Sequence, residues 1–199
     1  MNVHELMERD PKRYRTEYER WSYSAADHEW WSYVYENFQS EAIYSGLIVN
    51  DIRFSGFWSQ GDGAGFTGTI KLHKWMQFHG CAVDYPALYM AYEQDDTKAL
   101  IDLAHRGYSQ TVEVAAVRFS EPEGIFAGLD TDAWLDLVSE QEMRFIADDK
   151  IRDYVHDMSH KLYRDLEAEY THLTSEESFI EFCEFNSEFF EESNDEVSA

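Results

Sequence analysis

The chain is poor in basic residues and in cysteine. It has 16 Lys+Arg against 40 Asp+Glu, a formal net charge of −24, and no Lys or Arg follows Arg164. So large an acidic excess repels nucleic acid and anionic membranes and favours positively charged partners. Cys81 and Cys183 lie far apart and form no CxxC pair. Two such cysteines exclude a disulfide scaffold, and we expect both thiols to be reduced and buried.

Long apolar runs and known catalytic motifs are missing as well. No apolar stretch approaches the roughly 20 residues that would span a bilayer, and the polar start MNVHELMERD is unlike a signal peptide. We therefore expect a cytoplasmic protein. The sequence contains no GxSxG, no paired catalytic His and Ser and no P-loop. It predicts no catalytic residues and no cofactor, and it favours a protein that is not an enzyme without deciding the question.

The apolar content predicts a folded protein in spite of the charge. Hydrophobic residues make up 44% of the chain and aromatic residues 16%, enough to bury a substantial core. We expect a single domain over residues 1–199. Its order of segments, helical over 1–46, a small sheet with short helices over 47–120 and an acidic helical region over 121–199, predicts an α+β fold.

The first segment shows helix signals. Asp10 and Pro11 form a typical start, since Asp caps a helix and Pro is tolerated at its first position. A second helix is expected to begin between Ser24 and Asp27 and to run toward Gly46. Basic residues between positions 9 and 20 are expected either to face the acidic helices or to relieve local repulsion.

The middle segment has strand patterns. LIVNDIRF (47–54) and GFTGTIKL (65–72) flank a Gly-rich turn, which predicts an antiparallel hairpin. The β-branched run YSQTVEVAAVRF (108–119) predicts a third strand, for a small antiparallel sheet of about three strands. Short helices are expected over 73–79, 86–93 and 96–105.

The connection between the two hairpin strands, residues 54–66, has an unusual sequence, FSGFWSQGDGAGF. Its glycines permit close backbone approach, and its aromatic residues can hold it against a core. Turn chemistry alone explains the Asp and Gly. The alternative is a site for a small ligand or substrate, because GDGAG superficially resembles a phosphate-binding loop, although it matches neither GxGxxG nor GxxxxGK[ST]. The residues of that alternative site are Ser55, Trp58, Ser59, Gln60 and Asp62.

This loop string, FSGFWSQGDGAGFTG, and the later LYRDLEAEYTHLTSEESFIEFCEFNSEFFEE (162–192) resemble an uncharacterised protein family of tailed phages and prophages. Members of that family carry a similar FSGFWSQGDG loop and a C-terminal YRxLExEYxxLTS segment. The resemblance covers roughly a quarter of the chain and supplies no catalytic assignment. It implies a viral origin, and hence either binding to a host component or a part in virion assembly in which the acidity is incidental.

The C-terminal region concentrates the acidic charge. Residues 121–199 hold a net charge of −18, and residues 1–120 only −6. Thr174-Ser-Glu-Glu177 is a capping-box pattern that predicts a helix start. Beyond it, glutamates follow at spacings of 4, 3, 4 and 3, which places five carboxylates in one stripe. Solubilisation or adaptation to a salty host would explain acidity everywhere, but not this uneven distribution.

Charge density is comparable with that of nucleic acid. Ten acids between 165 and 192 give one carboxylate per roughly 4 Å of helix, and one strand of B-DNA has a phosphate per roughly 3.4 Å. A break near residues 171–175 limits the match to linear density. The sequence therefore predicts an inhibitor that mimics nucleic acid. Its partner would be a basic host protein that binds DNA or RNA. The chain itself would contact neither nucleic acid nor membrane, and whether it forms a homodimer is left undecided by the sequence. The predicted acidic face comprises Asp153, Asp157, Asp165, Glu169, Glu177, Glu181, Glu184, Glu188 and Glu191.

Histidines form two weaker candidate sites. His156 and His160 lie at i,i+4, a spacing that can bind a metal, in a string that is HExxH with Asp in place of Glu. No third ligand is evident, so no metal is predicted and an ion-pair role on a solvated face is favoured. His73, His79 and Cys81 form a looser group, for which a core or turn role is favoured.

Overall fold

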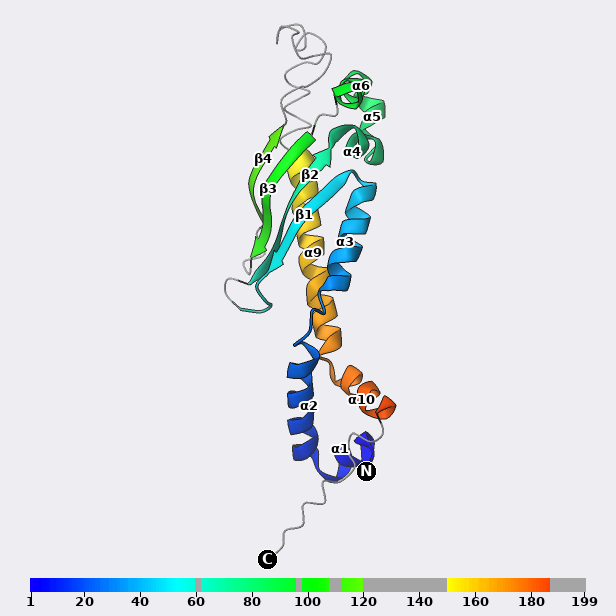
Figure 1. Ribbon diagram of the computed structural model, residues 1–199, viewed down its shortest axis with the longest axis vertical. Coiled ribbons are helices and arrows are strands. Elements are labelled where there is room, and N and C mark those ends of the chain that lie inside the picture. The colour runs from blue at the N-terminus through cyan, green and yellow to red at the C-terminus, as the bar shows by residue number, and fades with distance from the viewer. Residues whose placement is uncertain (60–61, 96–97, 108–111, 120–149, 187–199) are drawn as a thin grey trace, which may run out of the picture. The chain divides into compact units, whose positions relative to one another are not determined.

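The computed structural model describes residues 1–59, 62–95, 98–107, 112–119 and 150–186 (Figure 1). Its helices and strands follow in the order α1 (Val3–Arg9), α2 (Pro11–Ala25), α3 (Ser32–Tyr44), β1 (Leu47–Phe54), β2 (Gly63–Lys71), α4 (Leu72–Phe78), α5 (Cys81–Asp84), α6 (Pro86–Asp95), β3 (Lys98–Gly107), β4 (Val112–Phe119), α9 (Ile151–Leu173) and α10 (Glu176–Phe185). The predicted α+β class, with N-terminal helices, an antiparallel sheet and a C-terminal helical region, is confirmed.

The chain divides into two compact units, with boundaries inside the predicted segments. The first unit joins residues 1–32 to residues 166–199, and the second contains residues 33–165. Helix α9 contributes residues to both. Each unit has its own apolar core, described separately below.

The first unit is built around Phe179 of α10. Its ring lies 5.6 Å from that of Tyr14, 5.7 Å from that of Tyr18 and 5.4 Å from that of Trp21, all on α2. The other buried members of the core are Val3, Leu6 and Cys183. The Tyr18 hydroxyl donates to the carbonyl of Thr174 at 2.7 Å, which links α2 to the turn before α10. Aromatic burial thus joins helices that are distant in sequence.

Two of the helix starts in this unit follow the sequence signals. Asp10 caps α2 by accepting a hydrogen bond from the amide of Arg13, with Pro11 at the first position, as predicted. Helix α10 begins one residue later than its pattern indicates, because Ser175 and not Thr174 is the N-cap. Thr174 instead donates to the carbonyl of Tyr170 at the end of α9.

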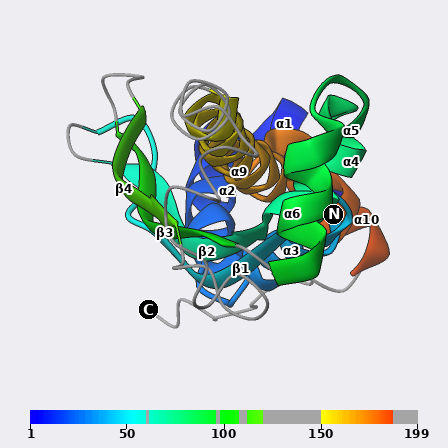
Figure 2. The same ribbon diagram turned by 90° about the horizontal axis from the view of Figure 1, so that it is seen from above.

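The second unit contains a four-stranded antiparallel sheet in the order β1-β2-β3-β4. The hairpin predicted over 47–72 is confirmed, with Arg53 opposite Gly65 and Leu47 opposite Ile70. Figures 1 and 2 show α9 along one face of this sheet. Helix α3 packs on the same face, where Phe38 meets Phe66 at 5.5 Å. Ser45, the residue directly after α3, forms a hydrogen bond with Tyr154 of α9.

Two sequence predictions are wrong here. Residues 96–105 were expected to be helical, but residues 98–107 form β3, which pairs on both sides with β2 and β4. Alternate residues Ala99 and Ile101 are buried, and sheet pairing overrides the helical propensity of Ala and Leu. The sheet therefore has four strands rather than about three. Helix α3 also begins at Ser32, later than predicted, because residues 26–31 form turns and bends in which Asp27, His28 and Glu29 are exposed.

Two glycines give a matched test of packing around α4. Gly46 and Gly80 both have positive φ, +84° and +73°. A Cβ at Gly46 would lie 2.9 Å from the Cβ of Lys74, whereas a Cβ at Gly80 would meet nothing within 4 Å. An alanine is strained by the positive φ at both positions, but it clashes with its neighbours only at position 46. We expect Gly46→Ala to lower the free energy of unfolding by about 1–3 kcal/mol more than Gly80→Ala, as measured by urea denaturation. Equal losses would contradict the enclosure of Gly46.

Candidate functional site

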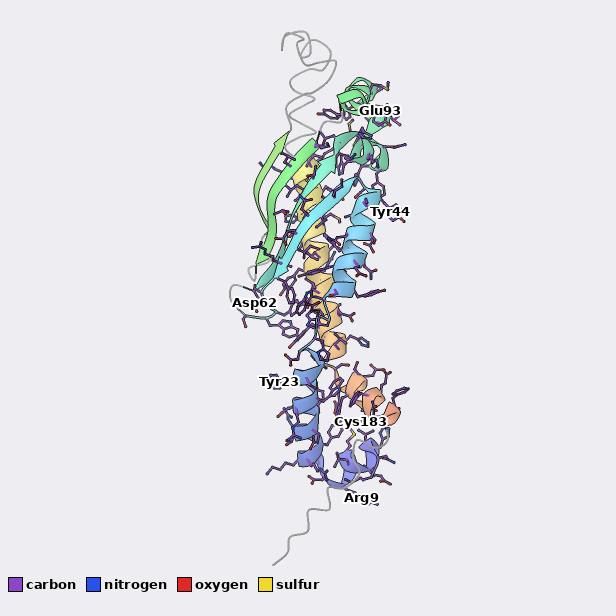
Figure 3. The ribbon with its side chains drawn as sticks, in the orientation of Figure 1. Arg9, Tyr23, Tyr44, Asp62, Glu93 and Cys183 are labelled. Carbon is purple, nitrogen blue, oxygen red and sulfur yellow. The ribbon has the colours of Figure 1, made fainter. Side chains whose placement is uncertain are left out.

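Helix α10 separates its apolar and acidic residues. Phe179 and Cys183 are buried against α1 and α2, while Glu177, Glu181 and Glu184 are exposed. Figure 3 labels Cys183 on α10. Glu184 accepts a hydrogen bond from His4 on α1 if that histidine carries its proton on Nε2, with the two side chains 2.9 Å apart. The predicted stripe therefore exists over its first three members. Glu188 and Glu191 lie outside the described residues.

The acidic residues of α9 are interrupted by a lysine. Asp153, Asp157, Lys161 and Asp165 follow at steps of four, so they lie in one row on the helix. The Lys161 ammonium is 2.6 Å from the Asp165 carboxylate and 2.7 Å from that of Glu41. Burial opposes its charge, but these two carboxylates outweigh burial and raise the pKa of Lys161. Asp165 thus shares the Lys161 charge with Glu41 within the second unit, whereas Asp153 and Asp157 are exposed carboxylates.

The predicted acidic face consequently divides between the two units. Asp153, Asp157 and Asp165 belong to the second unit, and Glu169, Glu177, Glu181 and Glu184 to the first. Among the described residues, Asp153, Glu177 and Glu181 form no ion pair. The carboxylate of Asp157 lies 3.7 Å from the Nδ1 of His156.

Two arginines of the first unit pair within their own helix. Arg15 contacts Glu19 at 3.0 Å, and Arg20 contacts Glu17 at 3.2 Å. These are i,i+4 and i,i+3 pairs on α2. They fit the second role predicted for the basic cluster, relief of local repulsion, and not contact with the acidic helices. Such exposed pairs contribute about 0.2–1 kcal/mol each and leave the carboxylates of α10 unneutralised.

The loop between β1 and β2 is held by its own aromatic residues and by Asp62. Phe57 lies 5.9 Å from Phe54 and 5.6 Å from Tyr163 of α9, ring to ring. The Asp62 carboxylate accepts a hydrogen bond of 2.8 Å from the amide of Ser59. Asp62 therefore serves the turn, as the structural interpretation predicts. Gln60 lies outside the described residues.

A cavity of about 430 Å³ lies beside this loop, on the hairpin. Of the five residues predicted for a ligand, Ser55 alone is among the described lining residues, and Trp58, Ser59 and Asp62 are not. The described lining residues are Asp51, Arg53, Phe54, Ser55, Gly63, Gly65, Phe66 and Thr67. The other seven were not among the predicted ligand residues, although the alternation of β1 could have placed Asp51 and Arg53 on one face.

The polar groups of the cavity are partly satisfied by one another. Arg53 donates from Nε to Asp51 at 2.7 Å. The Ser55 hydroxyl accepts from the amide of Gly63 at 3.1 Å, which closes the hairpin. Burial and the Asp51 carboxylate raise the pKa of the neighbouring Tyr35 to about 12. In register, Gly65 pairs with Arg53 on one side and with His105 of β3 on the other.

The two histidines of α9 do lie together. The rings of His156 and His160 have centroids 4.6 Å apart. Over the part of the chain that the structure describes, no group of three or more His, Cys, Asp or Glu residues is arranged to hold a metal ion. Two ligands are fewer than the three or four protein ligands of typical zinc sites.

Residues 30–176 match a protein family described as "Domain of unknown function (DUF8835)". The chain belongs to this family. The DUF8835 match contains the hairpin, its loop and the cavity, whereas Glu177, Glu181 and Glu184 follow it. Searches of curated proteins and of solved structures gave no significant match. No helix in the described parts of this DUF8835 member has the length and apolarity to cross a membrane.

The turn role of Asp62 can be tested by a pair of substitutions. Asp62→Ala removes the acceptor of the Ser59 amide and should lower the free energy of unfolding by about 1 kcal/mol. Asp62→Asn keeps an oxygen acceptor in the same place and should lose less than half of that amount. Chemical denaturation followed by tryptophan fluorescence measures both. If the two variants lost the same stability, the carboxylate would act through its charge and not through this hydrogen bond.

Proposed function

We propose that the protein is a phage-encoded acidic binding protein that acts in the host cytoplasm. It inhibits a basic host protein that binds DNA or RNA, by presenting carboxylates in place of phosphates. The observation that supports this proposal most is the exposed carboxylate stripe of α10, whose members Glu177 and Glu181 form no ion pair with the described residues. Two of the bases of α2, Arg15 and Arg20, pair with Glu19 and Glu17 on their own helix and not with that stripe.

Stability does not explain this distribution of charge. Like charges at i,i+4 oppose helix formation by roughly 0.2–0.5 kcal/mol per pair, and α10 carries such a pair in Glu177 and Glu181. A net charge of −24 also gives long-range attraction to a basic surface. Binding by such a surface is fast and salt-sensitive, and it competes with nucleic acid for the same basic groove.

The experiment is an affinity capture from bacterial lysate, with captured proteins identified by mass spectrometry. The wild type is expected to retain a nucleic-acid-binding protein, which duplex DNA or high salt releases. The triple variant Glu177→Gln, Glu181→Gln, Glu184→Gln should lose at least tenfold in captured amount, because it removes three charges from one face.

A control variant carries the same net charge with a different distribution. Glu29→Gln, Glu36→Gln, Glu93→Gln neutralises three exposed acids outside the proposed face and should retain capture. Equal losses in both triple variants would mean that only total charge matters. Capture that persists without the α10 carboxylates, or that DNA does not displace, would contradict mimicry.

The cavity on the hairpin favours a second candidate function, the binding of a small ligand. Its volume of about 430 Å³ lies within the roughly 300–1,000 Å³ of typical ligand sites. Arg53 uses its Nε in the pair with Asp51 and has an exposed side chain, so its terminal nitrogens can face an anionic group.

A thermal-shift screen with nucleotides and small carboxylates tests this second function. A true ligand at about 100 times its Kd should add about 2.7 kcal/mol to the stability of the folded protein. Arg53→Gln should abolish that gain, while Arg152→Gln, which changes an exposed arginine of α9 outside the cavity, should keep it. No stabilisation by any compound, or stabilisation that survives Arg53→Gln, would contradict an anion site in this cavity.

A further inference from the structure

A cysteine and a lysine that the proposed function does not use lie together in the second unit. Cys81, the first residue of α5, is buried with 4% of its surface exposed. The ammonium Nζ of Lys150, directly before α9, lies 3.9 Å from the Cys81 sulfur and can donate to it. The fold thus brings a nucleophilic sulfur and an amine into contact, although the two residues are 69 positions apart in the sequence.

Aromatic side chains surround this pair. The Lys150 ammonium also lies over the ring of Tyr85, 5.8 Å from its centroid. The His79 ring packs against Trp75 at 4.6 Å and Tyr154 at 5.1 Å. Partial burial and the nearby Lys150 charge lower the pKa of His79, so its imidazole is neutral at pH 7. Lys150 is therefore a cation of this cluster, and its amine is within reach of the Cys81 sulfur, which also lies 3.9 Å from the carbonyl oxygen of His79.

We propose that Cys81 and Lys150 form an oxidative modification site, in which a peroxide converts the contact into a covalent sulfenamide bond. Burial limits access to small oxidants such as hydrogen peroxide. The product links α5 to the start of α9, both within the second unit.

The reaction has two steps that balance. The Cys81 thiolate attacks one peroxide oxygen, so that a sulfur–oxygen bond forms, the oxygen–oxygen bond breaks, and hydroxide leaves. Sulfur loses two electrons, which reduce the peroxide. Hydroxide takes a proton from the Lys150 ammonium and becomes water. The neutral amine then attacks the sulfenic sulfur, the sulfur–oxygen bond breaks, and the departing hydroxide and the amine proton form a second water.

The other cysteine offers an internal comparison. Cys183 is buried to the same extent, and burial together with the Glu17 carboxylate raises its pKa to about 11. A thiol so rarely ionised reacts slowly with peroxide. The modification should therefore occur at Cys81 and spare Cys183.

The test treats the full chain with hydrogen peroxide and analyses tryptic peptides by mass spectrometry. We expect a linked peptide pair joining Cys81 to Lys150, about 2 Da lighter than the sum of the two peptides, which dithiothreitol separates. Lys150→Arg keeps the positive charge but lacks the amine nucleophile. In that variant dimedone, which traps sulfenic acid, should label Cys81 at least fivefold more than in the wild type.

Three outcomes would overturn the proposal. One is an unmodified Cys81 at peroxide concentrations that oxidise an exposed thiol in a reference peptide. Another is equal dimedone labelling of the wild type and Lys150→Arg, since Lys150 would then capture nothing. The last is a linked pair about 14 Da heavier than the sum, because the oxygen would then be retained and no condensation would have occurred.

Discussion

The second unit depends on the close approach of backbone to backbone at β2. This strand pairs with both β1 and β3, and its Gly68 leaves no room for a side chain, since a Cβ there would lie 2.7 Å from the carbonyl oxygen of Ile48. The same strand buries Phe66 and Ile70 on the face that α3 and α9 cover. Its outward glycines, Gly63 and Gly65, line the cavity. Core, sheet register and cavity are thus properties of one glycine-rich strand.

Aromatic burial is what allows so acidic a chain to fold. In the first unit Phe179 alone contacts three aromatic rings of α2, and its helix places its glutamates on the opposite side. The repulsion among those glutamates is screened by water and costs tenths of a kcal/mol per pair, whereas one buried aromatic ring contributes a few kcal/mol. The apolar side of α10 therefore determines its position, and its acidic side is free to vary with function.

Local sequence signals predicted the elements whose stability is itself local. The Asp10-Pro11 start, the 47–72 hairpin and the break after α9 all follow from caps, turns and alternation. Residues 98–107 could not be assigned in this way, because their strand depends on partners on both sides. At the candidate site, Asp62 could be assigned to the turn from its neighbours. The pairing of Lys161 with Glu41 and the contact of Cys81 with Lys150 join distant segments, which no local pattern reveals.

The location of the family match separates the acidic surface from the rest of the chemistry. The DUF8835 match ends at residue 176, at the first residue of α10, so the Glu177, Glu181 and Glu184 stripe follows it. The hairpin cavity and the Cys81–Lys150 contact lie inside it. A function shared by the family would have to reside in the matched region, whereas binding through α10 would be a property added at its C-terminal side. Neutralising α10 leaves the residues around the cavity and Cys81 unchanged, so loss of capture in that variant reports on the acidic helix alone.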